Sequence, residues 1–366
     1  MERKKYKEIY NDIINNIQAQ KLLPGDKLPT EEQLMETYNV SRTTIRKALK
    51  LLENANLIYR IKKAGTFLNG KTNRNSASKI IPFIFPKNDD TIKVINVMQT
   101  FALLNNCFVP MHDSKNNPEE ERKILLSFLN TNINALLIYS CSKQKNIDLL
   151  SEFIIKKIPV IFIDRSYFGL DSPLVSSDNK RGMYALVSRL ISMGHKRIAY
   201  FAISDIMFTS ESNRFTGYCS ALIDKGIPLR KEYIFRQSTF DERDTTTEQQ
   251  NSFTLSCINA VNNIINMTER PSVICCNNDN SARTIINLLA EQGIRCPKDI
   301  SVTGFDDSPL ATSEYPCITT VAQSFDKIGE AAINVAINIL KNQPVTTITN
   351  VETKIIERDT VSVLNT

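Results

Sequence analysis

The sequence contains two histidines among its 366 residues, His112 and His195, which leaves little scope for histidine-based metal binding or acid–base catalysis. Its eight cysteines are scattered without a C-x-x-C pair, and Cys275 and Cys276 are adjacent inside an apolar run. This distribution favours buried, reduced thiols over disulfides or metal ligands. The sequence therefore predicts no metal site, and nothing in it calls for a cofactor.

Two phosphate-binding signatures, G-x-G-x-x-G and G-x-x-x-x-G-K-[ST], are absent, so a dinucleotide or nucleoside triphosphate site is unsupported. No apolar run approaches the roughly 18–20 residues that a membrane-spanning helix needs. The first residues, MERKKYKEIYND, are too polar for a signal peptide. We therefore expect a cytoplasmic globular protein with no membrane partner, long enough for two or three domains.

The excess positive charge is confined to one end of the chain. Residues 1–71 hold 14 lysines and arginines against 8 aspartates and glutamates, whereas residues 72–366 hold 31 of each kind. A local excess of cations favours binding to a polyanion, because binding releases condensed counterions. The charge distribution therefore predicts salt-sensitive binding of nucleic acid near the N-terminus.

Residues 28–56 contain two short helical patterns joined by a tight turn. Thr30 and Gln33 have the spacing of a capping box, which predicts a helix that begins after Pro29. Ser41 is a suitable N-cap for the second helix. One face of this second helix is apolar at helical spacing, at Ile45, Ala48, Leu49 and Leu52. The two patterns together predict a helix-turn-helix.

The other face of the second helix is polar and basic, with Arg42, Thr43, Thr44, Arg46 and Lys47. Guanidinium and hydroxyl groups at a helix N-terminus suit guanine edges and phosphates. Residues 57–61 and 66–68 then predict two strands around a basic tip at 62–65. Such a unit can place a helix in the DNA major groove and a hairpin on the flanking backbone. The alternative is an ordinary helical hairpin with a solvated charged face.

From Tyr6 to about Leu68 the chain resembles the winged helix-turn-helix of GntR-type bacterial transcription regulators, through segments 28–31, 40–49, 57–58 and 65–67. The resemblance implies that Arg42 and Arg46 contact bases or phosphates, with hydroxyl groups assisting. Family members usually have glycine at the positions of Asn56 and Lys63. A lysine at position 63, in the tip of the hairpin (the wing), implies that the tip is attracted to DNA phosphates instead of contacting the minor-groove backbone. The complete candidate DNA-binding set is Ser41, Arg42, Thr43, Thr44, Arg46, Lys47, Lys62, Lys63 and Gly65.

Residues 70–79 are polar and aperiodic, which predicts a linker between a DNA-binding domain at 1–69 and a second domain at 80–366. In the second domain short apolar runs alternate with helical patterns. The runs lie at 80–85, 135–139, 160–163, 198–203, 273–276 and 300–305, and the helical patterns near 91–104, 118–129, 147–156, 179–193, 213–225, 254–267, 280–292 and 325–340. This alternation predicts an α/β architecture with parallel sheets in two lobes.

Polar side chains follow three of these apolar runs, at the strand ends where open α/β sheets bind ligands. Asp164, Asn278 and Asp306 could hydrogen-bond a polyhydroxylated ligand there. Arg214 could add a fork of donors and Phe240 an aromatic face for a sugar ring. The alternative is that the residues at the strand ends cap the helices that follow.

Residues 80–366 resemble the effector-binding domain of LacI/GalR-type regulators, which is itself similar to periplasmic sugar-binding proteins. The matching segments are 164–165, 177–179, 193–199, 217–218, 278–279, 304–307 and 318–321. The resemblance implies sugar contacts from Asp164, Arg214, Asn278 and Asp306, and by looser alignment from Phe240, Gln323 and Phe325. It makes His195 structural. The first residues of this domain, 80–90, lack the usual glycine–valine start, which leaves one wall of the pocket undefined.

A GntR-type head on a LacI/GalR-type body is the arrangement of arabinose-repressor-like regulators, and residues 116–122 resemble that subgroup as well. The resemblance implies a repressor of carbohydrate-utilisation genes, homodimeric on a palindromic operator of double-stranded DNA and released by a sugar effector, with L-arabinose the first to test. It implies no enzymatic activity. Three alternatives stay open: an activator, a constitutive regulator with a decayed pocket, and an enzyme with a pyridoxal-phosphate transaminase-like body.

Overall fold

A computed structural model describes residues 2–19, 22, 25–54, 57–61, 64–68, 78–87, 89–142, 144–202, 209–236 and 246–364 of the chain. The predictions for Lys62, Lys63 and Phe240 fall outside these described residues, as does most of the predicted linker. The chain divides into two compact units, one of residues 1–81 with 97–110 and the other of residues 82–96 with 111–366. The two units are described separately below.

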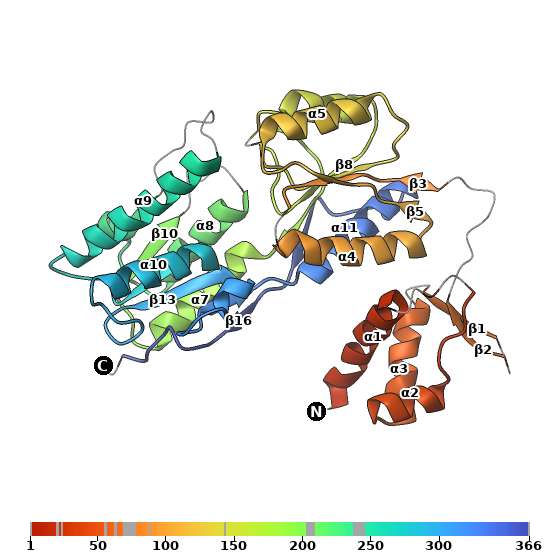
Figure 1. Cartoon of the computed structure of the whole chain (residues 1–366), viewed down its shortest axis with the longest axis horizontal. Helices are drawn as coiled ribbons and strands as arrows, with labels where there is room; N and C mark the ends of the chain where they lie inside the picture. Colours follow the sequence, from red (N-terminus) through yellow and green to blue (C-terminus); the bar gives the residue numbers. More distant parts are fainter. Residues whose placement is uncertain are drawn as a thin grey trace. The chain divides into compact units, whose positions relative to one another are not determined.

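In the first unit, the described residues between 2 and 68 form helices and a hairpin (Figure 1). These elements are α1 (Glu2–Ala19), α2 (Glu31–Tyr38), α3 (Arg42–Asn54), β1 (Ile58–Ile61) and β2 (Gly65–Leu68). The predicted capping box opens α2: Thr30 Oγ1 accepts a hydrogen bond from Gln33 N at 3.2 Å, and Gln33 Oε1 accepts one from Thr30 N at 2.8 Å. The turn after α2 passes through Asn39, whose φ of 46° is left-handed.

The predicted apolar face of α3 lies in the core of this unit. Its four residues, Ile45, Ala48, Leu49 and Leu52, are all fully buried. They pack in one cluster with isoleucines of α1, a helix that the sequence interpretation did not include. Strands β1 and β2 pair antiparallel as predicted, with Ile61 opposite Gly65 at the tip. The helix-turn-helix and its hairpin are therefore one packed body.

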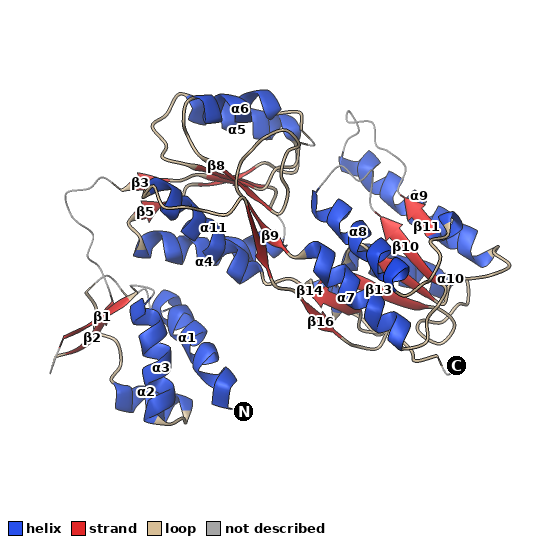
Figure 2. Cartoon of the chain, turned by 180° about the vertical axis from the view of Figure 1, so that it is seen from behind, coloured by secondary structure: helices blue, strands red, loops and turns tan. Residues whose placement is uncertain are grey.

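In the second unit one sheet has six parallel strands in the order β15-β9-β8-β7-β4-β6, and we call it and its helices the first lobe. Its strands are β4 (Phe83–Phe85), β6 (Met111–Asp113), β7 (Leu136–Ile138), β8 (Val160–Ile163), β9 (Leu174–Ser177) and β15 (Ile348–Val351). Helices α5 (Pro118–Leu129) and α6 (Ile147–Ile155) lie on the opposite face of the sheet from α11 (Phe325–Leu340) (Figure 2).

The second sheet has the order β11-β10-β12-β13-β14-β16 and forms the second lobe. Its pairs are parallel except for β14 with β16. The strands are β10 (Ile198–Ala202), β11 (Ile234–Arg236), β12 (Val273–Cys276), β13 (Ser301–Asp306), β14 (Thr319–Ala322) and β16 (Lys354–Ile356). The helices are α7 (Asn179–Ser192), α8 (Thr209–Asp224), α9 (Thr246–Ile265), α10 (Asp279–Glu291) and the short η1 (Lys231–Tyr233) and η2 (Pro309–Ala311). The predicted two-lobed α/β architecture is confirmed.

The two lobes are joined where the chain passes from β9 into α7, from β14 into α11 and from β15 into β16. The first and last of these connections touch, because Asp178 N donates a hydrogen bond to Val351 O at 2.8 Å. This arrangement brings the carboxyl ends of strands from both lobes towards the connections. The lobes can therefore share a site that is built from strand ends.

The irregular start of the second predicted domain has a structural counterpart. The run at 80–85 is interrupted at Pro82, which has no N–H for a ladder, and becomes β3 (Lys79–Ile80) and β4. Strand β3 pairs with β5 (Cys107–Phe108), within the first unit, whereas β4 belongs to the first lobe. Helix α4 (Asp89–Leu104), which follows β4, begins two residues before the predicted helix at 91.

Candidate DNA-reading surface and effector site

The polar face of α3 is accessible, as a DNA-reading helix requires. The side chains of Arg42 and Arg46 are 52% and 61% exposed, and Ser41, Thr43 and Lys47 are exposed as well. Thr44 differs, because its side chain is 7% exposed and its hydroxyl lies 2.9 Å from Ser41 Oγ. The two arginines are therefore accessible to DNA, whereas the Thr44 hydroxyl is engaged by Ser41 within the first turn of the helix.

One carboxylate, Glu31 at the start of α2, binds three arginines of this surface. It accepts from Arg46 Nε at 3.1 Å, from Arg42 Nε at 3.2 Å and from Arg60 Nη1 at 3.1 Å. Burial raises the pKa of Glu31, but the hydrogen bonds and positive charges of Arg46, Arg60 and Arg42 outweigh burial and leave the pKa below its ordinary value. Neither Glu31 nor Arg60 was predicted as a site residue.

The hairpin is tied to the helices through this same carboxylate, because Arg60 lies on β1. Gly65, the predicted wing residue, opens β2 with a left-handed φ of 126°. A side chain there would be strained and would also collide with the stem of Lys27. The glycine therefore permits the sharp return of the chain at the hairpin tip.

At the candidate effector site, Asp164 and Asp306 lie at the ends of β8 and β13. Both have a left-handed φ, 63° and 109°, which is strained for a residue with a side chain. Asp306 Oδ1 accepts from Arg214 Nη2 at 3.1 Å and from Gln323 Nε2 at 2.6 Å. Three residues that the sequence separates widely, and that were all predicted as sugar contacts, thus meet at one carboxylate.

Arg214, on α8, is the centre of this cluster and is 6% exposed. Its Nε donates to Asn179 Oδ1 at 2.7 Å, its Nη1 donates to the carbonyl of Asn277 at 2.5 Å, and its guanidinium lies 3.8 Å from the centre of the Phe305 ring. Burial lowers the pKa of Arg214, but the nearby carboxylates, Asp306 first, outweigh it and raise the pKa. Arg214 is therefore a buried, charged donor fork with a fixed orientation.

Asp164 links the two lobes. Its Oδ2 accepts a hydrogen bond from Ser210 Oγ of α8 at 3.0 Å and lies 3.4 Å from Arg165 Nε. Two residues further on, Ser166 N donates to Thr209 Oγ1 at 3.1 Å. The strand end of the first lobe is therefore held against the first turn of α8 in the second lobe.

A further carboxylate, Asp279, is buried close enough to Asp306 to feel its charge; the sequence interpretation placed it at a strand end but did not include it among the sugar contacts. It accepts from Thr320 Oγ1 at 2.6 Å and from Ser308 N at 2.7 Å. Burial and the charge of Asp306 raise the pKa of Asp279 to about 7, and burial also raises the pKa of Asp306. A Cβ at Gly304 would collide with the Asp279 carboxylate, so only glycine allows β13 to pass this close to α10.

The remaining predicted sugar contacts, Asn278, Phe325 and Gln323, differ in the roles that the structure gives them. Asn278 caps α10 by accepting from Ser281 N at 2.9 Å, which is the role that the capping alternative assigns to it. Phe325 opens α11, with Lys93 Nζ 5.7 Å from the centre of its ring. Gln323 Oε1 is buried and accepts no hydrogen bond from the residues that the structure describes. Gln323 thus retains an acceptor at the strand end.

The chemistry of this cluster is recognition by hydrogen bonds. Charged donors and acceptors with fixed geometry can discriminate the hydroxyl groups of a neutral polyol. His195, buried between Ser272 Oγ and the carbonyl of Ser362, lies outside the cluster. Within the described ranges, no group of three or more His, Cys, Asp or Glu side chains is placed to hold a metal ion. Nor does any helix of those ranges combine the length and apolarity needed to cross a bilayer.

Comparisons with known proteins give a match for each of the two parts of the chain described above. Residues 5–68 match the gntR family of bacterial regulatory proteins, and residues 187–361 match the periplasmic binding protein-like domain. The chain is therefore a DNA-binding transcription regulator with an effector domain. More narrowly, it joins a DNA-binding domain of the gntR family to a periplasmic binding protein-like domain, as the two resemblances predicted.

Two relatives align with nearly the whole chain. The arabinose metabolism transcriptional repressors of Halalkalibacterium halodurans and Geobacillus stearothermophilus are 26% and 25% identical, each over 93% of this chain and over 90% and 92% of their own lengths. Among solved structures, a complex of the transcriptional regulator CelR with cellobiose has a TM-score of 0.64 at 17% identity, covering 88% of this chain and 91% of that one. These relatives are regulators rather than enzymes, in agreement with the prediction.

Proposed function

We propose that this protein represses carbohydrate-utilisation genes and that a sugar releases it from its operator. The observation that carries the proposal is the set of Asp164, Arg214, Asp306 and Gln323, the first two buried and the other two half-buried, which gathers strand ends of both lobes. A ligand that hydrogen-bonds to both lobes stabilises their closed arrangement over others. L-Arabinose is the first candidate, because full-length relatives are named as repressors of arabinose metabolism.

On the DNA side, we propose that α3 enters the major groove with Arg42 and Arg46 towards base edges, and that the hairpin lies on the flanking backbone. A homodimer with two-fold symmetry would place two such helices on a palindromic operator. The division into a DNA-binding domain at 1–69, a linker at 70–79 and an effector domain at 80–366 belongs to the same proposal.

The test combines calorimetry with DNA binding. An operator is first selected from random duplexes with the full chain, and its symmetry is read from the selected sequences. L-Arabinose, D-xylose, D-ribose and cellobiose are then titrated into the protein and into the complex. We expect one of these sugars to bind saturably and to weaken operator binding at least tenfold. Saturable sugar binding with unchanged operator affinity would refute release, and no binding of any sugar of a complete monosaccharide and disaccharide panel would support the decayed-pocket alternative.

A further inference from the structure

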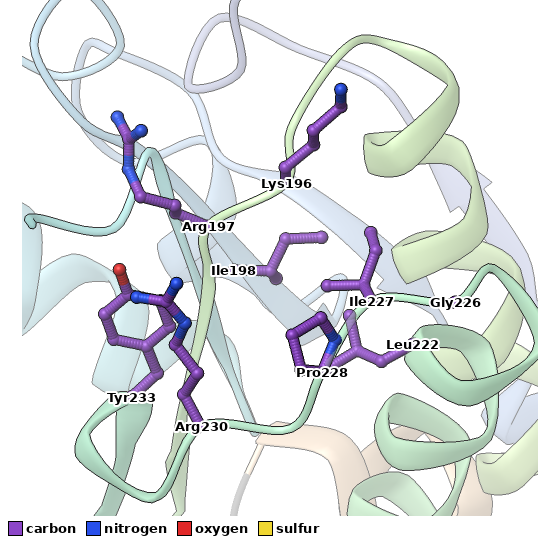
Figure 3. A pocket seen from close by; sticks show the side chains of 9 residues that line it. All are labelled: Lys196, Arg197, Ile198, Leu222, Gly226, Ile227, Pro228, Arg230 and Tyr233. Carbon is purple, nitrogen blue, oxygen red and sulfur yellow. The ribbon is translucent and has the colours of Figure 1, made fainter.

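The second lobe has a cavity of about 240 Å³ at the start of β10, but its polar side chains do not converge on it (Figure 3). Those of Lys196 and Arg197 diverge and point away from it, and Ile198 and Leu222 at its base are 2% and 1% exposed. The first lobe, in contrast, has a buried polar cluster beside the ends of β7 and β8. We call it the Glu121 cluster, and it consists of Glu121, Ser140, Ser142, Asn146 and Tyr167.

Glu121 is the inward-facing member of three consecutive glutamates at the start of α5. The side chain of Asn117 caps this helix and fixes where it begins. Helical spacing then places Glu121 on the same face as Leu125 and Leu129, and all three are buried, whereas Glu119 is exposed. A carboxylate that is removed from water must find its hydrogen-bond donors within the protein.

Neutral donors that follow β7 reach both oxygens of Glu121. Ser140 Oγ lies 2.9 and 3.0 Å from them, Cys141 N donates to Oε2 at 2.8 Å, and Asn146 Nδ2 donates to Oε1 at 3.0 Å. Ser140 and Asn146 are as completely buried as Glu121. These three residues are therefore held to a carboxylate that comes from a different element of the lobe.

Hydroxyl groups extend the Glu121 cluster to the end of β8. Ser140 has one hydroxyl proton, which is directed at the Glu121 oxygens because these can only accept, so the Tyr167 hydroxyl at 2.7 Å must donate to Ser140. Ser142 Oγ contacts the same Tyr167 hydroxyl. Tyr167 lies three residues after Asp164, so the cluster ties the ends of β7 and β8 together.

The residues beside the cluster face the proposed sugar site. Tyr139 and Arg165 are half-buried, and the Arg165 guanidinium lies 4.9 Å from the centre of the Tyr139 ring. Burial raises the pKa of the Tyr139 hydroxyl, and the charge of Arg165 lowers it. The charges of Asp164 and Asp306 act on the same hydroxyl, which therefore lies within reach of a carboxylate from each lobe. We call Tyr139, Asp164 and Arg165 the first-lobe wall.

We propose that Glu121 is a positioning residue for the effector site. It does not touch the sugar, but it joins the ends of β7 and β8 so that the first-lobe wall keeps a fixed geometry. A wall that is ordered before the ligand arrives lowers the entropy cost of binding. The inference rests on the proposed function, because the wall contacts a sugar only if a sugar binds beside Asp164.

Glu121→Gln tests the proposal, because it keeps the size of the side chain but replaces one acceptor by a donor, which the Asn146 amide cannot satisfy. The full chain is titrated calorimetrically with L-arabinose, D-xylose, D-ribose and cellobiose, and the affinity for the tightest of these should fall by about fivefold or more. Tyr167→Phe keeps the ring stacked on Phe162, at 5.5 Å between centres, and should cause a smaller loss. Glu119→Gln, exposed on the same helix, should leave the affinity unchanged.

A fluorescence measurement without sugar separates positioning from a general loss of stability. The chain has no tryptophan, so Tyr139→Trp introduces a single emitter into the first-lobe wall. In that background Glu121→Gln should increase acrylamide quenching by roughly twofold, because the wall opens locally more often. The matched control is Leu129→Ala at the other end of α5, which removes a buried side chain and should lower the unfolding temperature without changing the quenching or the sugar affinity.

Quenching that is the same with and without Glu121→Gln would overturn the proposal, whatever happens to the affinity. An equal loss of sugar affinity in Leu129→Ala would overturn it as well, because the effect would then follow from stability alone. If Glu121→Gln does not fold, Tyr167→Phe decides in both measurements. If the wild type binds none of the sugars, the proposed function fails, and the quenching still decides whether Glu121 holds the first-lobe wall.

Discussion

The candidate DNA-reading surface and the candidate effector site are both built around arginine–carboxylate pairs, but their arginines differ in burial. At the DNA-reading surface Glu31 holds Arg42 and Arg46, whose side chains are more than half exposed. At the effector site the side chain of Arg214 is 7% exposed, whereas Asp306 at 16% is shielded to about the same degree as Glu31 at 18%. An exposed pair contributes little stability and is exchanged easily, whereas one member of a buried pair cannot be removed without stranding the other.

This difference suits the two proposed tasks. Arginines that bind DNA must leave their protein partner for phosphates or base edges, so a weak and solvated pair is an appropriate resting arrangement. A site that distinguishes one sugar from another needs donors and acceptors that are already oriented before the ligand arrives. The predictions below test this contrast.

The largest effect is expected for Arg214→Met. The substitution leaves Asp306 buried without its cation, which should lower the free energy of unfolding by about 3–5 kcal/mol. Urea unfolding of the full chain measures it. Arg189→Met is the control, because Arg189 pairs with Glu357 on the surface and its loss should cost less than about 1 kcal/mol. If the two variants lost similar amounts of unfolding free energy, the buried and the exposed ion pair would contribute equally to stability, contrary to this prediction.

Arg46→Ala should weaken operator binding by about 1–3 kcal/mol, with the stability of the protein and its sugar binding unchanged. The physical reason is that Arg46 is exposed, so that losing its pair with Glu31 costs little stability while its contact with DNA is lost. Fluorescence anisotropy with the selected operator measures the change. Lys50→Ala is the control on the same helix, since Lys50 lies one turn beyond Arg46 and outside the predicted DNA-binding set. Loss of sugar binding in Arg46→Ala would contradict the independence of the two regions.

The buried site should also show a pH dependence of its own. Asp279 has a pKa of about 7 in the folded chain against 3.8 for the ordinary carboxyl group, so the folded chain binds more protons than the unfolded chain between these values. Stability should therefore fall as the pH rises from about 4 to 7, by at most about 1.4 kcal/mol per pH unit, and the contribution is constant above that window. Asp279→Asn should remove this fall in denaturant titrations across that range.

For Asp299, tested by Asp299→Asn, the expected dependence of stability on pH has the opposite sign. Hydrogen bonding by Arg295 lowers the pKa of exposed Asp299 to about 2, so its contribution to stability is present above pH 4 and is lost as the pH falls towards 2. Comparing each variant with the wild type isolates the single group from the other carboxylates. An Asp279→Asn curve that runs parallel to the wild type between pH 4 and 7 would show that Asp279 ionises normally.

The sequence predicted those parts of the molecule that local chemistry determines. The capping box at Thr30 and Gln33 and the helical spacing from Ile45 to Leu52 are both confirmed, because these signals lie within a few residues of each other. The strand-end rule selected Asp306 correctly, and Arg214, which was predicted separately because it lies near a helix start, meets it from α8. The missed helix α1 had a usable signal in Ile9, Ile13 and Ile17, which recur at helical spacing.

Other features could not be found in this way. Glu31 stood inside a recognised motif, but its choice of three arginines depends on how α2 and β1 pack against α3. Asp279 follows Asn278 at a strand end, and only the packing of β13 decides which of the two side chains turns inwards. Tertiary packing therefore decides which charged groups pair, and the pairs cannot be read from the positions of the charged residues in the sequence.

The smallest effect, and the sharpest test of the exposed pairs, is expected for Glu31→Gln. The variant keeps the shape of the side chain but removes the negative charge that competes with DNA for Arg42, Arg46 and Arg60. Each exposed pair contributes less than about 1 kcal/mol, so binding to a random duplex should tighten by roughly three- to tenfold, with a steeper dependence on salt. Because Glu31 also orients the arginines, the ratio of operator to random-duplex affinity should fall. Anisotropy at several salt concentrations measures both quantities, with Glu36→Gln, an exposed acid of the same helix, as the control. If Glu31→Gln bound random duplexes no more tightly than Glu36→Gln, the carboxylate would not be a competitor of DNA, and the three ion pairs would serve the packing of the hairpin against the helices alone.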